Sequence, residues 1–524
     1  MSESQNKPQA GSSGRGDWSA ANLATLALLS VFAFLIVGYH PGLEDDAFYL
    51  AAIKRNLNPS LFPHDADFFR LQFQATIFDK LIAWSVRLTH VPLAWAALVW
   101  QFAAIFFVVH GCWRISRRCF SRPEAQWAAV TMIAALLTLP VSGTAISLVD
   151  QHLHPRTLAT AAILAAVVAV LDRRLWQAGV LLAIAFSIHA IMASFGISLC
   201  AFLLWNQRAS RRHGQLCPPI AAALLMPMGW IFEPASDPWR QAAATCGFYF
   251  LAHWTWYEWL GVFAPLILLF AFWRFLSHRR DADGKHSALP LLVFSLLYYG
   301  VFQTVVGLVI MLPPQFERLR PFEPMRYLHL FYVFFFLIAG GLLGRYVLRR
   351  HVYRWALLFV PLSAGMFYAQ RQMYPATVHL EFPGVAPENA WLQAFTWIQQ
   401  NTPVDSLFAV DPNYIELPGE DYHGFRALAE RSVLADYGKD GGMAARVPRL
   451  APRWLKEVTA QRGWENFQAA DFQRLKAEFG VTWVIVSRPD ALFSNAPSDA
   501  AQVQSAMGMS CPYRNRQLEV CRLY

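Results

Sequence analysis

The first apolar run of the chain leads directly into three adjacent carboxylates, in the stretch AANLATLALLSVFAFLIVGYHPGLEDD (residues 20–46). Residues 20–38 carry no charge and are long enough to cross a bilayer, which takes roughly 20 mostly apolar residues. Glu44, Asp45 and Asp46 would then lie where this helix reaches water. An acidic cap on a helix that lies on the membrane surface explains one such acid. Three together also indicate a site for a cation or a proton.

The composition of the whole chain supports a membrane location. Of its 524 residues, 56% are hydrophobic and only 15% are charged, more apolar surface than a soluble protein of this size could cover. We therefore predict a polytopic α-helical membrane protein in which residues 176–205 form either two spans or one broken, re-entrant unit. About eleven spans are expected, at residues 20–38, 91–112, 125–141, 156–171, 176–190, 191–205, 217–232, 257–275, 288–311, 325–344 and 354–370.

Lys and Arg are distributed unevenly between the two sides of these spans. With the N-terminus inside, the inner segments hold 19 of the 30 Lys and Arg residues before residue 375, and the outer segments hold 12 of the 18 acidic residues there. Basic residues accumulate on the cytoplasmic side of membrane proteins. The pattern predicts a multi-pass protein of the bacterial inner membrane, and it explains the net charge of +9 without a nucleic-acid partner. Its expected parts are a disordered cytoplasmic N-terminus (1–19), a membrane domain (20–374) with a first outer loop at 39–90, and a periplasmic tail (375–524).

The tail differs in character from the rest of the chain. Its segment ENAWLQAFTWIQQN predicts a helix that ends at a Thr-Pro pair, and SLFAV and VTWVIVS predict buried strands, with the helix DFQRLKAEFG between them ending at Gly480. This alternation predicts a C-terminal periplasmic α/β domain. Cys511 and Cys521 flank PYRNRQLEV, a predicted hairpin, so the two residues form either a disulfide or two free thiols in an oxidising periplasm.

A second outer loop carries residues suited to binding a phosphate. In SGTAISLVDQHLHPRTLAT, Asp150, His152, His154 and Arg156 lie close together, and Pro155 suits the first turn of a helix. A guanidinium beside the free backbone N–H groups of a helix N-terminus binds phosphate well. The alternative is an interfacial arginine that reaches toward lipid headgroups.

Two further positions add ionisable groups near the outer ends of predicted spans. The loop PPQFERLRPFEPMRYLHL supplies Arg320 and Arg326, the second of them at the start of a span. His189, in AFSIHAIMAS, lies near the outer end of another span, where an ionisable group is a functional candidate. A hydrogen-bonded structural histidine is the alternative.

The layout and the acidic motif resemble the GT-C superfamily of membrane glycosyltransferases. Asp45-Asp46-Ala-Phe-Tyr49 is similar to the Asp-Glu-x-x-Tyr motif of the protein O-mannosyltransferase and aminoarabinose transferase branch, with Asp45 in place of the catalytic aspartate and Asp46 in place of its acidic neighbour. WLQAFTWIQQNTPVDSLFAV resembles the start of the outer domain of oligosaccharyltransferase catalytic subunits. Of their Trp-Trp-Asp-Tyr-Gly acceptor motif only Asp436-Tyr437-Gly438 is present, so peptide recognition is not supported. FRALAERSVLADYGKD is similar to a segment of uncharacterised bacterial membrane proteins of this layout.

The resemblance implies an enzyme that moves a sugar from a polyprenyl-phosphate donor to a glycan, lipid or protein acceptor of the cell envelope, at the periplasmic face. Asp45 would act as the general base. Asp46 and Asp150 would orient the acceptor, or Asp45 and Asp150 would hold Mg²⁺ or Mn²⁺, as in the metal-dependent oligosaccharyltransferase branch. The mannosyltransferase-like branch works without a tightly held metal, so the resemblance implies either case. Substrate and phosphate would be bound by Arg156, Arg326, Arg320, His154, His189 and Tyr49. An inactive GT-C-like accessory protein and a transporter of lipid-linked saccharides are the alternatives.

Overall fold

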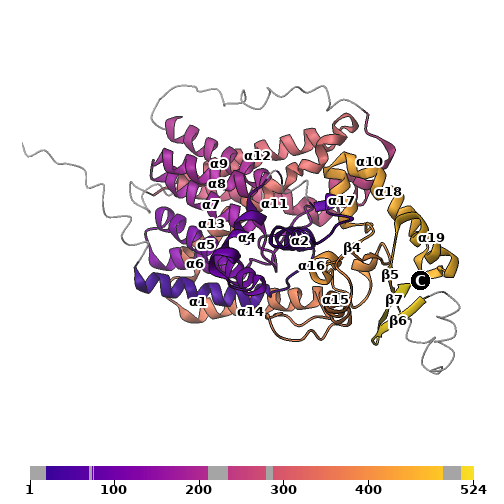
Figure 1. Ribbon diagram of the computed structural model, residues 1–524. Coiled ribbons are helices and arrows are strands. Elements are labelled where there is room, and N and C mark those ends of the chain that lie inside the picture. Colours follow the sequence, from indigo (N-terminus) through magenta and orange to yellow (C-terminus); the bar gives the residue numbers. More distant parts are fainter. Residues whose placement is uncertain (1–18, 70–73, 75, 210–233, 279–286, 488–508) are drawn as a thin grey trace, which may run out of the picture.

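Long helices pack side by side through most of the molecule, and a small β-sheet lies at one end (Figure 1). The computed structural model describes residues 19–69, 74, 76–209, 234–278, 287–487 and 509–524. Within these residues, seven helices are long and apolar enough to cross a membrane. The protein is therefore a polytopic helical membrane protein. Six of the seven are α1 (Ala20–Val37), α5 (Leu93–Cys119), α9 (Ala190–Ala209), α11 (Trp256–His278), α12 (Leu289–Met311) and α14 (Val352–Met373). The seventh is the continuous helical segment Pro324–Leu348, whose central part is α13 (Tyr327–Leu343).

The long helices differ in how much protein surrounds them. The segment of α13 is apolar all round, and 83% of its span is buried inside the molecule. By contrast, the apolar windows of α11 and α14 are 11% and 0% buried. A helix that is apolar on every side must contact either other helices or lipid. We therefore place α13 at the centre of the bundle and α11 and α14 on its lipid-facing surface.

The apolar helix α6 (Pro123–Ala135) is shorter than predicted. It ends at Ala135, and the chain then turns and forms a two-stranded antiparallel pair, β1 (Pro140–Val141) with β2 (Ile146–Ser147). Pro140 cannot continue a helix, because it lacks an N–H and its ring clashes with the preceding turn. The predicted span at 125–141 is therefore wrong in its last third.

Two other short apolar helices, α7 (Pro155–Leu171) and α8 (Leu175–Ile188), complete the bundle. α8 and α9 are separate helices that meet at His189, where a break between two segments was expected. The predicted span at 217–232 lies outside the described residues. Of the eleven predicted spans, seven coincide with these long helices in the described part of the chain, and α6, α7 and α8 lie at three others.

The helix that follows the acidic triplet is buried rather than spread on a membrane surface. Every residue from Asp46 to Ile53 in α2 (Asp46–Leu57) is buried. α4 (Phe78–Thr89) packs on one part of α2, and α16 (Phe425–Ala429), far along the chain, packs on another. The expected surface helix is therefore enclosed by protein.

The C-terminal region is built on a five-stranded sheet with the order β4-β3-β5-β7-β6. The two predicted strands form β3 (Leu407–Ala409) and β5 (Trp483–Ser487), which are parallel to each other, and β3 also pairs in parallel with β4 (Ser432–Val433). The predicted hairpin forms β6 (Met509–Arg514) and β7 (Leu518–Leu523), and the sulfur atoms of Cys511 and Cys521 are bonded across it. β7 pairs antiparallel with β5 and so joins the hairpin to the sheet.

Helices surround this sheet and connect it to the membrane helices. α10 (Asp237–Ala244), which belongs to the membrane part of the chain, packs against α17 (Lys439–Arg446) and α18 (Ala451–Ala460). This contact, together with that between α2 and α16, seats the C-terminal region on the ends of the bundle (Figure 1). The remaining elements are α15 (Ala390–Asn401), α19 (Ala469–Phe479), and the short helical turns η3 (Gly247–Tyr249), η4 (Leu251–His253), η5 (Pro314–Phe322), η6 (Pro324–Arg326), η7 (Gly344–Leu348), η8 (Tyr414–Glu416), η9 (Pro448–Leu450) and η10 (Trp464–Asn466).

Candidate functional site

The three adjacent carboxylates point in different directions. Glu44 accepts a hydrogen bond from the Tyr374 hydroxyl (3.0 Å) at the end of α14. Asp46 accepts one from the backbone N–H of Gly42 (2.7 Å), in a turn where Gly42 has a φ of +83° that favours glycine. Asp45 makes no capping bond to α2, and it is the member of the triplet that lines a cavity.

Asp45 lies between a cation and an imidazole. Its Oδ1 is 3.2 Å from Nζ of Lys439 on α17, and its Oδ2 is 3.7 Å from Nε2 of His154. Burial by itself would raise the pKa of Asp45, but the charge of Lys439 and the contact with His154 hold that pKa well below its usual range. Asp45 is therefore an anion at neutral pH, and its side chain retains 29% exposure.

His154 is fixed by the start of α7. Its Nδ1 accepts a hydrogen bond from the backbone N–H of Arg156 (2.9 Å), so in the neutral ring the proton is on Nε2, which faces Asp45. Burial lowers the pKa of His154, although the charge of Asp150 opposes that effect. The ring therefore turns a neutral Nε2–H toward the Asp45 carboxylate, at a distance longer than a hydrogen bond.

Asp150 and Arg156 form a buried ion pair behind His154. Burial would raise the pKa of Asp150, but the Arg156 guanidinium and the two neighbouring histidines lower it to about 2. Asp45 and Asp150 contact opposite nitrogens of His154, at 3.7 Å each, and each has its own cationic partner. Mg²⁺ and Mn²⁺ require several oxygens that converge on one point. The pair Asp45 and Asp150 therefore does not fit such a site.

Glu323 holds two arginines on the opposite wall. Its Oε2 lies 2.5 Å from Nη1 of Arg326, and its Oε1 accepts a hydrogen bond from Nη2 of Arg446 (2.9 Å). Glu323 stands between η5 and η6 with a φ of +53°, which is uncommon for a non-glycine residue and is found at strained functional positions. Among the described residues, the Nε atoms of Arg326 and Arg446 have no hydrogen-bond partner. Each guanidinium thus keeps a donor that a bound anion could satisfy.

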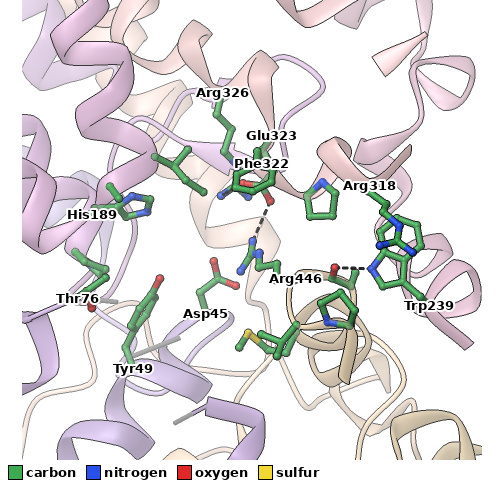
Figure 2. Close-up of a pocket in the computed structure, with 18 of the residues that line it drawn as sticks. Asp45, Tyr49, Thr76, His189, Trp239, Arg318, Phe322, Glu323, Arg326 and Arg446 are labelled. Atoms are coloured by element: carbon green, nitrogen blue, oxygen red, sulfur yellow. Dashed lines mark hydrogen bonds and ion pairs between the residues drawn. The ribbon is translucent and has the colours of Figure 1, made fainter. Parts of the chain in front are cut away.

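Asp45, His154, Glu323, Arg326 and Arg446 line one cavity of about 520 Å³, a size typical of small-molecule sites (Figure 2). Figure 2 shows Asp45 and Arg446 directed toward each other, with Glu323 and Arg326 beyond Arg446. Much of the wall is apolar, with contributions from Ile188, Ile191, Trp239, Phe322 and Met443. The charged side chains of the wall and its neighbour Lys439 have a net charge of +2, from the two carboxylates Asp45 and Glu323 and the four cations Lys439, Arg318, Arg326 and Arg446. An apolar wall with excess positive charge suits an amphiphilic anion.

The structure brings five of the predicted site residues to this cavity and leaves four outside it. The five are Asp45, Tyr49, His154, His189 and Arg326. Outside lie Asp46, which is turned toward Gly42, the paired Asp150 and Arg156, and Arg320, whose guanidinium stacks over the Phe250 ring at 5.1 Å.

The sequence prediction missed two charged residues of the site, Lys439 and Arg446, and it gave no role to Arg318 and Glu323 of the loop PPQFERLRPFEPMRYLHL. Lys439 and Arg446 are seven positions apart, in the segment directly after the Asp436-Tyr437-Gly438 triplet. Residues at this spacing lie on one face of a helix, so a basic face on α17 was a signal that could have been found. Glu323 carried no such signal, because its role depends on the two arginines it bridges.

Fold and site together define a polytopic helical membrane protein whose charged cavity is completed by a C-terminal sheet region. Residues 389–448 match the family model described as a domain of unknown function (DUF6798). The matched segment runs from α15 to the end of α17 and so includes both Lys439 and Arg446. No curated protein matches the chain.

Proposed function

We propose that this protein is a GT-C-like glycosyltransferase that moves a sugar from a polyprenyl-phosphate donor to an acceptor of the bacterial cell envelope. The observation that carries this proposal is the pairing, in one cavity beside the membrane helices, of an ionised carboxylate with arginines in an apolar wall. The Asp45-Asp46-Ala-Phe-Tyr49 motif, which resembles that of GT-C enzymes, supplies this carboxylate.

The donor would bind through its phosphate and its lipid chain. Arg446 and Arg326 keep unpaired Nε donors, and charge-assisted bonds from guanidinium to phosphate are among the strong ones. The apolar side chains of Ile188 and Ile191, at the junction of α8 and α9, give the first isoprene units a surface to contact. The cavity therefore offers separate places for the phosphate and for the lipid.

In the reaction, the acceptor hydroxyl attacks the anomeric carbon of the sugar as the bond from that carbon to the phosphate oxygen breaks. The electron pair of this bond leaves with the polyprenyl phosphate, whose charge Arg446 and Arg326 stabilise. Asp45 accepts the hydroxyl proton, which becomes acidic as the new bond forms. Lys439 holds the carboxylate in place, with His154 beside it, so Asp45 can reach only the part of the cavity that it faces.

The test is a deletion strain, in which surface glycans and lipid-linked sugars are profiled and the gene is returned as wild type or as a variant. We expect the strain to lack a glycan and to accumulate a lipid-linked sugar, and Asp45→Asn to restore neither. The matched control is Asp67→Asn, at an exposed aspartate of the same loop that does not line the cavity. Immunoblots of membranes show whether each variant is present.

Restoration of the glycan by Asp45→Asn at normal abundance would contradict the assignment of Asp45. A deletion strain with unchanged glycans and unchanged lipid-linked sugars would contradict the transferase. If instead the lipid-linked sugar accumulates on the cytoplasmic leaflet alone, the protein is a transporter of that lipid.

A further inference from the structure

Two histidines and a glutamate meet outside the cavity, where the chain leaves α1 and crosses the C-terminal region. Oε1 of Glu381 lies 2.6 Å from Nδ1 of His40 and 3.3 Å from Nε2 of His423. The three atoms all lie within 4.8 Å of one another. The side chains of His40 and His423 are 1% and 0% exposed, and that of Glu381 is 15% exposed. The reaction proposed above uses none of these groups.

Backbone pairing sets the positions of all three residues. The N–H of Tyr39 donates to the carbonyl of His379 (3.0 Å), and the N–H of Glu381 donates to the carbonyl of Tyr39 (2.9 Å). This short parallel pairing places His40 next to Glu381. Leu43 pairs antiparallel with His423, which brings the second ring to the same point. The three side chains are therefore held together by the fold, although they come from distant parts of the sequence.

The hydrogen bonds of His423 direct a lone pair at the glutamate. Its Nδ1 lies 3.0 Å from the carbonyl oxygen of Glu420, an acceptor, so Nδ1 carries the proton. In the neutral ring Nε2 is then unprotonated, and it faces a carboxylate oxygen at 3.3 Å. Two acceptors at this distance repel each other unless a proton or a metal ion lies between them. Histidines that bind metals characteristically donate their other N–H to a carbonyl or a carboxylate.

We propose that His40, Glu381 and His423 bind one Zn²⁺ ion, which ties the end of α1 to the C-terminal region. Two imidazole nitrogens and one carboxylate oxygen are a ligand set that suits zinc, with a fourth position left for water. Ligand atoms on tetrahedral zinc lie about 3.3 Å apart, since each is about 2.0–2.2 Å from the ion. The pair His423 and Glu381 has this spacing, and the pair His40 and Glu381 has to open by less than about 1 Å. The site also braces the loop that carries Asp45, five residues after His40, yet it does not depend on the proposed transferase activity.

The experiment is zinc binding by the full-length protein, purified in detergent, stripped with EDTA and dialysed free of chelator. After addition of ZnCl₂ and removal of the excess, we expect one zinc per chain by elemental analysis, and a melting temperature that rises with zinc concentration. Zinc X-ray absorption is expected to show two imidazole nitrogens and an oxygen. Glu381→Gln and His423→Gln are expected to weaken binding by at least the 10–100-fold that loss of an outer-shell partner of a metal typically costs.

The control is His379→Gln, because His379 is two residues from Glu381 but its Nε2 faces the Leu35 carbonyl (2.9 Å). It is expected to bind zinc like the wild type. A wild-type protein that takes up no zinc overturns the proposal, and a proton shared between His423 and Glu381 then accounts for the cluster. Unchanged zinc affinity in both Glu381→Gln and His423→Gln, with a folded profile on size exclusion, also overturns it, because the ion is then bound elsewhere.

Discussion

At the scale of single residues, neighbours in the sequence have different surroundings in the fold. Glu44 bonds to Tyr374, Asp45 faces the cavity, and Asp46 folds back onto Gly42. Burial raises the pKa of Asp46 to about 7, while Lys439 and His154 hold the pKa of Asp45 well below its usual range against the effect of burial. One carboxylate of the pair is thus fully ionised at neutral pH and the other is only partly so.

The raised pKa of Asp46 predicts a pH-dependent effect of Asp46→Asn on stability. The folded state keeps the Asp46 proton up to about pH 7, whereas the unfolded chain loses it near pH 3.8. Ionisation therefore destabilises the folded wild type progressively as the pH rises from about 4, and the full cost above pH 7 is up to about 4 kcal/mol. Asn cannot ionise and can still accept the Gly42 hydrogen bond, so the variant should gain more in melting temperature at pH 8 than at pH 5. An equal gain in melting temperature at both pH values would contradict this prediction. The control is Asp67→Asn, at an exposed aspartate.

Arg446 and Asp45 are expected to affect donor binding in opposite directions. Arg446→Gln removes a charge-assisted hydrogen bond to the phosphate, which is worth about 1.5–3 kcal/mol, so the affinity for a short-chain polyprenyl phosphate should fall by about tenfold or more. Asp45→Asn removes a negative charge from the same cavity and should leave that affinity unchanged or raise it. Binding is measured by titration of the protein in nanodiscs. Arg449→Gln, at an exposed position three residues further on, is the control, and an equal loss there would contradict a specific role for Arg446.

At the scale of elements, the contact between α2 and α16 depends on a glycine. A Cβ at Gly424 would lie 2.2 Å from Cβ and 2.6 Å from Cα of Ala47, so the backbone of α2 would have to move. We expect Gly424→Ala to destabilise the protein by about 1–3 kcal/mol, as overpacking of a core does. Gly438→Ala, before α17, is the control, since nothing lies within 4 Å of its Cβ position and its φ is −84°. Thermal unfolding in detergent compares the two, and equal melting temperatures would show that α16 is not packed on α2 as described.

The same elements show what the sequence could and could not predict. Runs such as residues 288–311 predicted α12 within a residue or two, because a span is marked by its own composition. Strand β5 and the helix before Gly480 were likewise predicted from local pattern. The burial of α2 could not be predicted, because it depends on packing against α16. The contact between Asp45 and Lys439 could not be predicted either, because it joins residues 394 positions apart. The sequence therefore indicates the site residues in the loops beside the spans. It does not indicate those contributed by the C-terminal region, whose local pattern predicts only a small α/β domain.

At the scale of the whole molecule, the contact between Asp45 and Lys439 places the first loop and the C-terminal region on the same side of the membrane. The distribution of Lys and Arg predicts that this side is the periplasm, which is where a transferase of this kind would meet its acceptor. Ser60 in the first loop, Gln400 in α15 and Ser121 between α5 and α6 are exposed and can each be replaced by cysteine. The four free cysteines among the described residues are buried, so Cys217→Ser gives a suitable background.

A membrane-impermeant maleimide applied to spheroplasts tests this topology. We expect Ser60→Cys and Gln400→Cys to react in intact spheroplasts, and Ser121→Cys to react only after the membrane is permeabilised. Detergent-solubilised protein serves as the control for accessibility, since all three positions should react there.

If Ser60→Cys and Gln400→Cys react from opposite sides, no cavity can form between the two parts of the chain. If both react only after permeabilisation, the cavity opens to the cytoplasm. Asp45 and Arg446 would then meet a soluble or inner-leaflet phosphate, and the proposed transfer at the periplasmic face would be wrong.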